Sequence, residues 1–133
     1  MTRLFIGIDS GTQSSRAILI DGGSGRVVAA HSAAHAMLPS DEPGTKEQDP
    51  ADWVRAMTTA LAELGAAGPD AASRVAAIGI SGQQHGFVPL DAEGRVIRPA
   101  KLWCDTSTAP QSVTLIQRLG GLSRTIQKLG KGI

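Results

Sequence analysis

The sequence holds one cysteine, no tyrosine, two phenylalanines and two tryptophans among its 133 residues. The single Cys104 cannot form an internal disulfide, and no Cys/His spacing typical of a zinc site is present, which favours the reducing cytoplasm. The formal net charge of +1 argues against a protein that binds nucleic acid or a membrane surface through a basic field. The sequence also lacks a signal-peptide pattern and the ~20 consecutive apolar residues of a membrane span. We therefore expect a soluble, cytoplasmic protein with no nucleic-acid or membrane partner.

What the sequence does contain is a series of short apolar runs separated by turn residues. Residues 4–8, 15–20 and 26–30 are rich in aliphatic side chains, and short polar or glycine-rich stretches join them. Runs of this length predict strands, and connections this short predict an antiparallel meander of three strands. With 41% hydrophobic residues, the chain is long enough for one domain with a modest core.

The rest of the chain mixes helical and strand patterns. After a polar loop over 39–49, Asp49 and Pro50 predict a helix start, because Asp caps a helix and Pro suits its first turn, and Gly65 predicts its end. The apolar residues at near-helical spacing predict packing against a sheet: Trp53, Val54, Met57, Leu61 and Leu64. Further patterns predict a strand over 74–80, a hairpin of 87–90 with 95–97, a helix from Asp105 or Thr106 to Leu119, and a helix over 123–129. We therefore expect an α/β fold with a mixed sheet.

The first strand ends on a carboxylate, Asp9, and Gly11, Thr12, Ser14 and Ser15 follow it. Small residues let backbone N–H groups approach a phosphate, and hydroxyls can donate to its oxygens. A carboxylate at the preceding strand end can hold Mg²⁺ through its waters. The same residue types are also favoured in an ordinary hairpin turn. The stretch therefore indicates either a metal and phosphate site or a plain turn.

A second polar stretch, GQQHG at residues 82–86, follows the predicted strand 74–80. The side chains of Gln84 and His85 can donate and accept hydrogen bonds at once, which suits neighbouring hydroxyls of a polyol. In open α/β sheets, ligands bind at strand ends, where this loop is expected. A polar turn with an exposed histidine is the alternative interpretation.

A third stretch ends a later segment with Trp103, Cys104 and Asp105. The indole can stack on a sugar and the carboxylate can accept from a hydroxyl, but a core tryptophan and a helix cap explain the same residues. Cys104 has no partner for nucleophilic chemistry and is interpreted as a small buried residue. His31 and His35 lack any ligand spacing and are assigned no function.

Together these stretches resemble the FGGY family of carbohydrate kinases, and within it the xylulokinases. The segments that carry the resemblance are GIDSGTQSSRAILID (7–21), EQDPxxW (47–53), GISGQQHGFVPLD (79–91) and RPAKLWCDTST (98–108). The resemblance implies an actin-like ATPase, or ribonuclease H-like, fold. It implies transfer of the γ-phosphate of ATP, with Mg²⁺, to a sugar hydroxyl, which converts D-xylulose to D-xylulose 5-phosphate in xylulokinases. It is also compatible with a homodimer of the full-length protein.

The resemblance also assigns roles to individual residues. It assigns Asp9 to organising the Mg²⁺ ion through water. It assigns four residues of the following turn to the phosphates of ATP: Gly11, Thr12, Gln13 and Ser14. It assigns four residues to the sugar pocket: Gln84, His85, Trp103 and Asp105. Glycerol kinases typically carry an Arg-Glu pair at the middle motif, so the Gln-His pair favours a ketose substrate.

Two departures from the family pattern bear on how much of an enzyme this chain represents. Many members have an arginine shortly after the third motif, where residues 106–108 here are Thr-Ser-Thr. Family members are several times longer, and their catalytic aspartate and second, nucleotide-binding domain follow later, whereas no aspartate follows Asp105 here. Residues 1–133 therefore correspond to the N-terminal part of the first kinase domain, which we expect to be inactive alone. A ribulokinase, gluconokinase or glycerol kinase-like protein and a non-catalytic sugar- or phosphate-binding half-domain are the alternatives.

Overall fold

The computed structural model describes residues 2–68 and 70–130 of the chain. These residues form two compact units. The first unit contains the chain up to Leu38 together with Glu47–Trp103, and the second contains Pro39–Lys46 and the chain from Cys104 onward. Within the described residues, no helix is long and apolar enough to cross a membrane.

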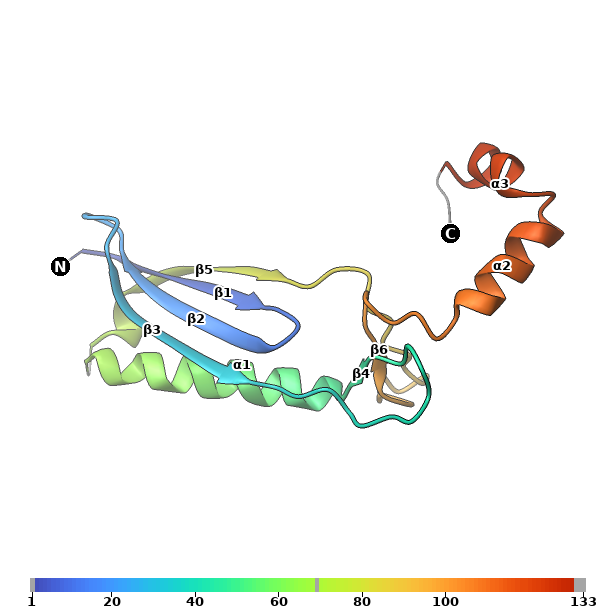
Figure 1. The fold of residues 1–133 in the computed structure, drawn as a ribbon. Helices are drawn as coiled ribbons and strands as arrows, with labels where there is room; N and C mark the ends of the chain where they lie inside the picture. Colours follow the sequence, from blue (N-terminus) through green and yellow to red (C-terminus); the bar gives the residue numbers. More distant parts are fainter. Residues whose placement is uncertain (1, 69, 131–133) are drawn as a thin grey trace. The chain divides into compact units, whose positions relative to one another are not determined.

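A four-stranded sheet with the order β3-β2-β1-β5 forms the centre of the first unit (Figure 1). Strand β1 (Leu4–Ser10) pairs antiparallel with β2 (Ser14–Asp21), which pairs antiparallel with β3 (Val27–Ala34). Strand β5 (Val75–Gly82) then adds to the other side of β1 in parallel. The predicted meander and the mixed sheet are both confirmed. The parallel pair brings the carboxyl ends of β1 and β5 to one edge of the sheet.

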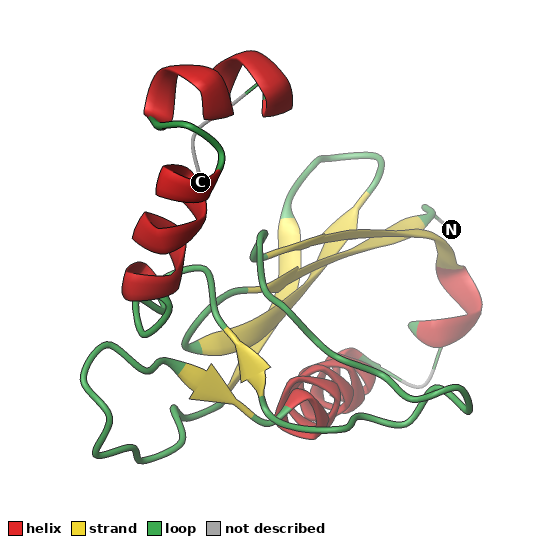
Figure 2. Cartoon of the chain, turned by 90° about the vertical axis from the view of Figure 1, so that its right-hand side faces the viewer, coloured by secondary structure: helices red, strands yellow, loops and turns green. Residues whose placement is uncertain are grey.

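Helix α1 (Pro50–Leu64) covers the β2 and β3 part of one sheet face (Figure 2). Its start is as predicted, because Asp49 Oδ1 accepts from the N–H of Ala51 at 2.9 Å and a proline occupies the first turn. The buried core that results contains Leu4, Ile8, Ala17, Leu19, Ala60, Leu64 and Ala71. The prediction that Val54 packs in this core is wrong, because its side chain is 58% exposed. Small residues, Ala56 and Ala60, lie at the contact instead.

The same helix leaves β5 uncovered. Ile78 and Ile80 pair in register with Ile6 and Ile8, so they lie on the helix side of the sheet, yet they are 55% and 72% exposed. Two short 3₁₀ helices, Gly65–Ala67 and Ala72–Arg74, connect α1 to this strand. The strand therefore owes its position to its backbone pairing with β1 rather than to side-chain burial.

The hairpin predicted from residues 87–90 and 95–97 forms only next to its turn, where the N–H of Asp91 donates to the carbonyl of Arg95 at 2.9 Å and that of Ile97 to the carbonyl of Pro89 at 3.0 Å. Its turn does form, because Asp91 Oδ1 accepts from the N–H groups of Glu93 and Arg95 at 3.0 and 2.8 Å. Beyond the turn only one bridge, Leu90 with Val96, is made. Phe87 exchanges backbone hydrogen bonds with Lys101 instead, so it does not pair with residues 95–97.

Lys101 belongs to β6 (Ala100–Lys101), which pairs antiparallel with β4 (Glu47–Gln48). The Glu47 carboxylate forms ion pairs with Arg98 and Lys101 across this small sheet. Through Gln48, the two-stranded sheet leads directly into the cap of helix α1. It therefore joins the start of the helix to the segment that carries Trp103.

The second unit contains α2 (Ala109–Arg118) and α3 (Leu122–Leu129). Helix α2 begins later than predicted, because Asp105 does not cap it. Asp105 Oδ1 accepts from the N–H and the hydroxyl of Ser107 at 3.0 and 2.6 Å, and Oδ2 accepts from the N–H of Lys46 at 2.8 Å. These bonds hold residues 105–107 in a turn before the helix starts. Helix α3 forms as predicted.

Candidate functional site at one edge of the sheet

The polar stretches predicted to be functional follow β1 and β5, whose carboxyl ends lie side by side. Asp9 is in register with Ser81, and Ser10 with Gly82. Past the end of the ladder, the N–H of Gln83 donates to the carbonyl of Ser10 at 2.9 Å. In α/β sheets this edge is where ligands bind, because loops leave it in different directions and open a crevice. We define this region as the carboxyl edge of the sheet.

Asp9 lies at the carboxyl edge with its carboxylate exposed to solvent. Its register partner on β2 is Arg16, but no ion pair or hydrogen bond joins the carboxylate of Asp9 to any residue that the structure describes. An unpaired carboxylate beside a polar turn fits Mg²⁺, which keeps most of its waters and takes one or two protein carboxylates. In the described part of the chain, no group of three acidic, His or Cys side chains could hold a metal, so a cation here would depend on Asp9 and on phosphate oxygens.

Between β1 and β2 the chain makes a tight turn at residues 11–14. The N–H of Gly11 donates to the carbonyl of Ser14 at 3.0 Å, and the hydroxyls of Ser10 and Ser15 lie 2.9 Å apart. Ser15 is fully buried, so it closes the hairpin and faces no ligand. The N–H groups of Thr12 and Gln13 donate to no described residue. The turn therefore has two adjacent backbone donors available to an anion.

Thr12 connects this turn to the other two polar stretches. Its hydroxyl donates to Oε1 of Gln83 at 3.3 Å and accepts from Nε1 of Trp103 at 3.1 Å. The single hydroxyl hydrogen is therefore used inside the protein. Gln83 directly precedes the Gln84-His85 pair, so Thr12 brings all three stretches of the first unit together.

Gln84 and His85 are both exposed at this edge. His85 has φ +60°, and among the described residues it is the only one other than glycine with positive φ. That left-handed conformation costs free energy for a side chain with a Cβ, and such residues cluster at functional sites. Trp103 is 60% exposed although its N–H is bonded, so its ring face is available for stacking.

Asp105 differs from the other predicted site residues, because it belongs to the second unit. There its carboxylate is occupied by Ser107 and Lys46, as described above. Cys104 is half-buried rather than buried. The structure therefore places four segments close together: Asp9, the 11–14 turn, Gln83–His85 and Trp103.

Three buried or half-buried residues beneath the 11–14 turn were missed by the motif analysis: His35, Gln48 and Trp53. Gln48 is fully buried and His35 is 8% exposed. Gln48 bonds to Thr12, His35 and Trp53. Burial lowers the pKa of His35, while backbone groups of Ser14 and Thr12 act in the opposite direction. The one sequence signal was the EQDPxxW segment, whose glutamine and tryptophan had no assigned chemistry.

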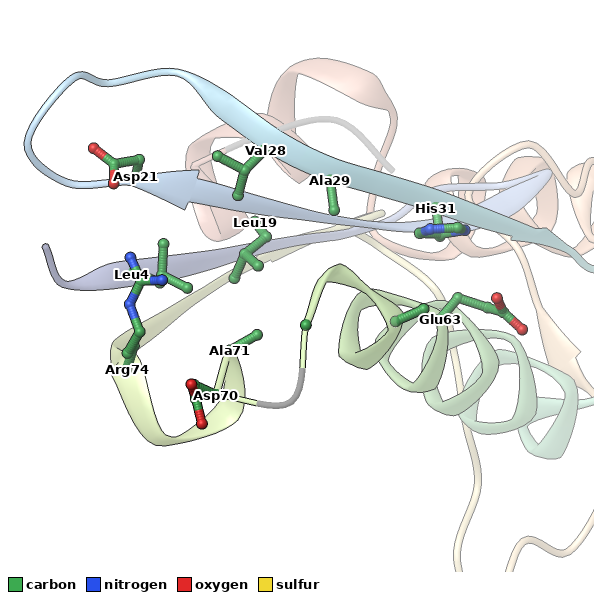
Figure 3. Close-up of a pocket in the computed structure, with 12 residues that line it drawn as sticks. Leu4, Leu19, Asp21, Val28, Ala29, His31, Glu63, Asp70, Ala71 and Arg74 are labelled. Carbon is green, nitrogen blue, oxygen red and sulfur yellow. The ribbon is translucent and has the colours of Figure 1, made fainter. Parts of the chain in front are cut away.

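A hollow of about 480 Å³ lies at the opposite end of the sheet (Figure 3). Its lining includes Leu4, at the amino end of β1, and the acidic side chains of Asp21, Glu63 and Asp70. The guanidinium of Arg74, on its rim, donates to the carbonyl and hydroxyl of Thr2. None of the predicted site residues lines this hollow, which separates it from the carboxyl edge.

The sequence matches a known protein family over almost its whole length. Residues 4–133 match the N-terminal domain of the FGGY family of carbohydrate kinases. The chain is 42% identical over 128 residues to a xylulose kinase of Streptomyces coelicolor and 40% identical over 131 residues to one of Haemophilus influenzae. Each alignment covers 96% of this chain, against 25% and 26% of the relative.

Solved structures extend the likeness to the fold. The xylulose kinase of Rhodospirillum rubrum superposes with a TM-score of 0.80 at 34% identity, over 89% of this chain and 24% of that one. The chain thus spans about a quarter of the length of these relatives. Its mixed α/β sheet is part of the actin-like ATPase fold of such sugar kinases. The chain belongs to the FGGY family of carbohydrate kinases.

Proposed function

We propose that this chain is the leading part of the first domain of an ATP-dependent sugar kinase that converts D-xylulose to D-xylulose 5-phosphate. The observation that carries the proposal is the meeting of three stretches at the carboxyl edge, where Thr12 bonds to both Gln83 and Trp103. Relatives that are 40% and 42% identical are named xylulose kinases, which supports the choice of sugar.

The phosphate side of the proposed site combines one carboxylate with backbone donors. Asp9, exposed and without a partner among the described residues, would hold the waters of Mg²⁺. When bound, the ion neutralises charge that develops on the phosphate oxygens during transfer. The N–H groups of Thr12 and Gln13 would bind phosphate oxygens directly, since they are adjacent and have no partner among the described residues.

The sugar side of the proposed site combines hydrogen-bonding side chains with an aromatic face. Gln84 and His85 carry donors and acceptors that can bind neighbouring hydroxyls of a ketose. The exposed indole of Trp103 would pack on the carbon skeleton while its N–H stays on Thr12. The family resemblance also assigns Asp105 to the sugar, but its carboxylate accepts hydrogen bonds from Lys46 and Ser107 within the second unit.

The transfer itself needs a group that accepts the proton of the sugar hydroxyl. That hydroxyl oxygen attacks the γ-phosphorus, the bond to the β-phosphate oxygen breaks, and ADP leaves. Asp9 is assigned to the metal, so we place the proton acceptor in a part of the complete enzyme beyond residue 133. Residues 1–133 alone are then expected to bind substrates without turnover.

Steady-state kinetics of the complete enzyme that carries this domain test the proposal. D-xylulose should give a higher kcat/KM than D-ribulose, gluconate or glycerol, with one ADP formed for each sugar phosphorylated. A preference for another of these phosphate acceptors would support kinase activity but identify a different substrate. Binding of a sugar with no ADP formation under any condition would instead identify a non-catalytic binding protein.

A further inference from the structure

The buried side chain of Gln48 makes three hydrogen bonds to three different segments. Its Oε1 accepts from Nε1 of Trp53 at 2.8 Å. Its Nε2 donates to the carbonyl oxygen of Thr12 at 2.8 Å and lies 3.3 Å from Nδ1 of His35. Gln48 is fully buried, so each of these bonds replaces one that water would otherwise make.

Donor and acceptor chemistry sets the orientation of the Gln48 amide. An indole N–H can only donate and a carbonyl oxygen can only accept, so the amide oxygen faces Trp53 and the amide nitrogen faces Thr12. The second hydrogen of that nitrogen is available to His35 Nδ1, which accepts it only when this ring nitrogen carries no proton. His35 is then neutral with its hydrogen on Nε2, an atom without a hydrogen-bond partner among the described residues.

The cluster holds two consecutive carbonyls of the 11–14 turn from inside the protein. Gln48 binds the carbonyl of Thr12, and the backbone N–H of His35 donates to the carbonyl of Gln13 at 3.0 Å. The N–H groups of the same two residues have no partner in the described structure. The carbonyl of Thr12 and the N–H of Gln13 belong to one planar peptide and point in opposite directions. Holding that carbonyl inside the protein therefore fixes the direction in which Gln13 presents its N–H group.

We propose that Gln48 is a positioning residue for phosphate binding. It orients the peptide between Thr12 and Gln13, and with it the N–H of Gln13, while Trp53 sets the direction of its amide and His35 accepts its second hydrogen. This inference rests on the proposed function, in which the 11–14 turn binds the phosphates of ATP. Gln48 itself touches neither substrate. Its loss should weaken nucleotide binding and leave sugar binding almost unchanged.

The test is Gln48→Glu in the complete enzyme. The glutamate keeps the size and the acceptor for Trp53, but it has no N–H for the carbonyl of Thr12. We expect the KM for ATP to rise about tenfold, the loss typical of one buried hydrogen bond, while the KM for D-xylulose changes less than about twofold. Gln111→Glu on the exposed face of α2 is the matched control and should change neither constant.

A second variant covers the case in which Gln48→Glu does not fold, which thermal unfolding would reveal. Trp53→Phe keeps an aromatic ring and removes only the N–H that orients the amide. It should raise the KM for ATP a few fold without changing the KM for the sugar. If a folded variant of either kind changes both constants equally, or neither, the positioning role is wrong.

A spectroscopic measurement separates this inference from the proposed function. Nitrogen-15 NMR of the complete enzyme with labelled histidine should show His35 in the Nε2–H form, and Gln48→Glu should move its proton to Nδ1, facing the new carboxylate. Calorimetric titration with ATP should show about tenfold weaker binding in the same variant. If no sugar is phosphorylated, the proposed function fails, whereas unchanged ATP affinity in Gln48→Glu overturns the positioning role alone.

Discussion

The indole nitrogen of Trp103 donates a hydrogen bond to the hydroxyl oxygen of Thr12 at 3.1 Å, across 91 positions of sequence. The same hydroxyl donates to Gln83 at 3.3 Å. One small side chain therefore joins the turn proposed to bind phosphate to both stretches proposed to bind sugar. Because its hydrogen is already used, the contribution of Thr12 to phosphate binding should come from its backbone.

Thr12→Val should raise the KM values for both ATP and D-xylulose in the complete enzyme. Valine has the same shape, but it can neither donate to Gln83 nor accept from Trp103, so both neighbours lose a partner. Each lost bond is worth about 1 kcal/mol, or about fivefold. Thr12→Ser keeps the hydroxyl and should stay close to the parent. If Thr12→Val raised the KM for ATP alone, the hydroxyl would not link the two sides.

His85→Gly should raise the KM for D-xylulose much more than the KM for ATP. Glycine adopts the positive φ of this position without strain, so the loop can keep its conformation when the imidazole is removed. We expect an increase of about tenfold for the sugar, from loss of one hydrogen bond to a bound hydroxyl. His31→Ala on the exposed part of β3 is the control. Equal changes for both substrates would remove His85 from the sugar pocket.

Asp9→Asn should lower kcat by about a hundredfold or more, because the loss of one group that stabilises transferred charge costs this much. The carboxylate has no described protein partner, so the variant should unfold at the same temperature as the parent. Activity should also need more Mg²⁺ for half-saturation. Asp41→Asn in the polar loop serves as the control. Full activity in Asp9→Asn would exclude the proposed metal role.

Much of the fold follows from local patterns in the sequence. The three strands of the meander carry continuous apolar runs, and the turns between them contain residues that favour chain reversal. Helix α1 starts where Asp49 and Pro50 predict, because a cap and a first-turn proline act within a few residues. The predicted hairpin after β5 is shorter than expected because Phe87 pairs with Lys101, a partner that no local pattern identifies.

For the candidate site, too, the sequence predicts some features and not others. Asp9 and the glycine-bounded Gln84-His85 pair were recognised because unusual polar residues follow apolar strands. The bonds from Trp103 to Thr12 and from Gln48 to His35 depend on tertiary structure and have no sequence signature. His35 was assigned no function because spacing alone does not show that a histidine is buried and bonded. The order of the strands places the motifs, and side-chain packing decides which of them meet.

Asp21 should make the stability of the folded chain fall as the pH becomes strongly acidic. Hydrogen bonds from the hydroxyl of Thr2, the backbone and hydroxyl of Ser24, and the N–H of Gly23 lower the pKa of Asp21 from 3.8 to about 2. Because the folded state holds this proton less tightly than the unfolded state, the carboxylate stabilises the fold above pH 3.8. That contribution disappears as pH falls through about 2.

Asp21→Asn should therefore reduce the free energy of unfolding at pH 7, as measured by denaturant titration. The difference between parent and variant should shrink as pH falls through the window from 3.8 to about 2. Asp41→Asn should show no such convergence. A difference that stays constant through this window would mean that the charge of Asp21 does not act through these bonds.

Placement of the sugar and the phosphates at one edge of the sheet is tested most directly by paramagnetic NMR. Mn²⁺ would replace Mg²⁺ in the complete enzyme, together with a non-hydrolysable ATP analogue and carbon-13-labelled D-xylulose. We expect strong broadening of the bound sugar signals, which weakens in Asp9→Asn and disappears in His85→Gly at sugar concentrations that saturate only the parent. Tight binding of D-xylulose with sharp signals would contradict it, because sugar and metal would then occupy separate places.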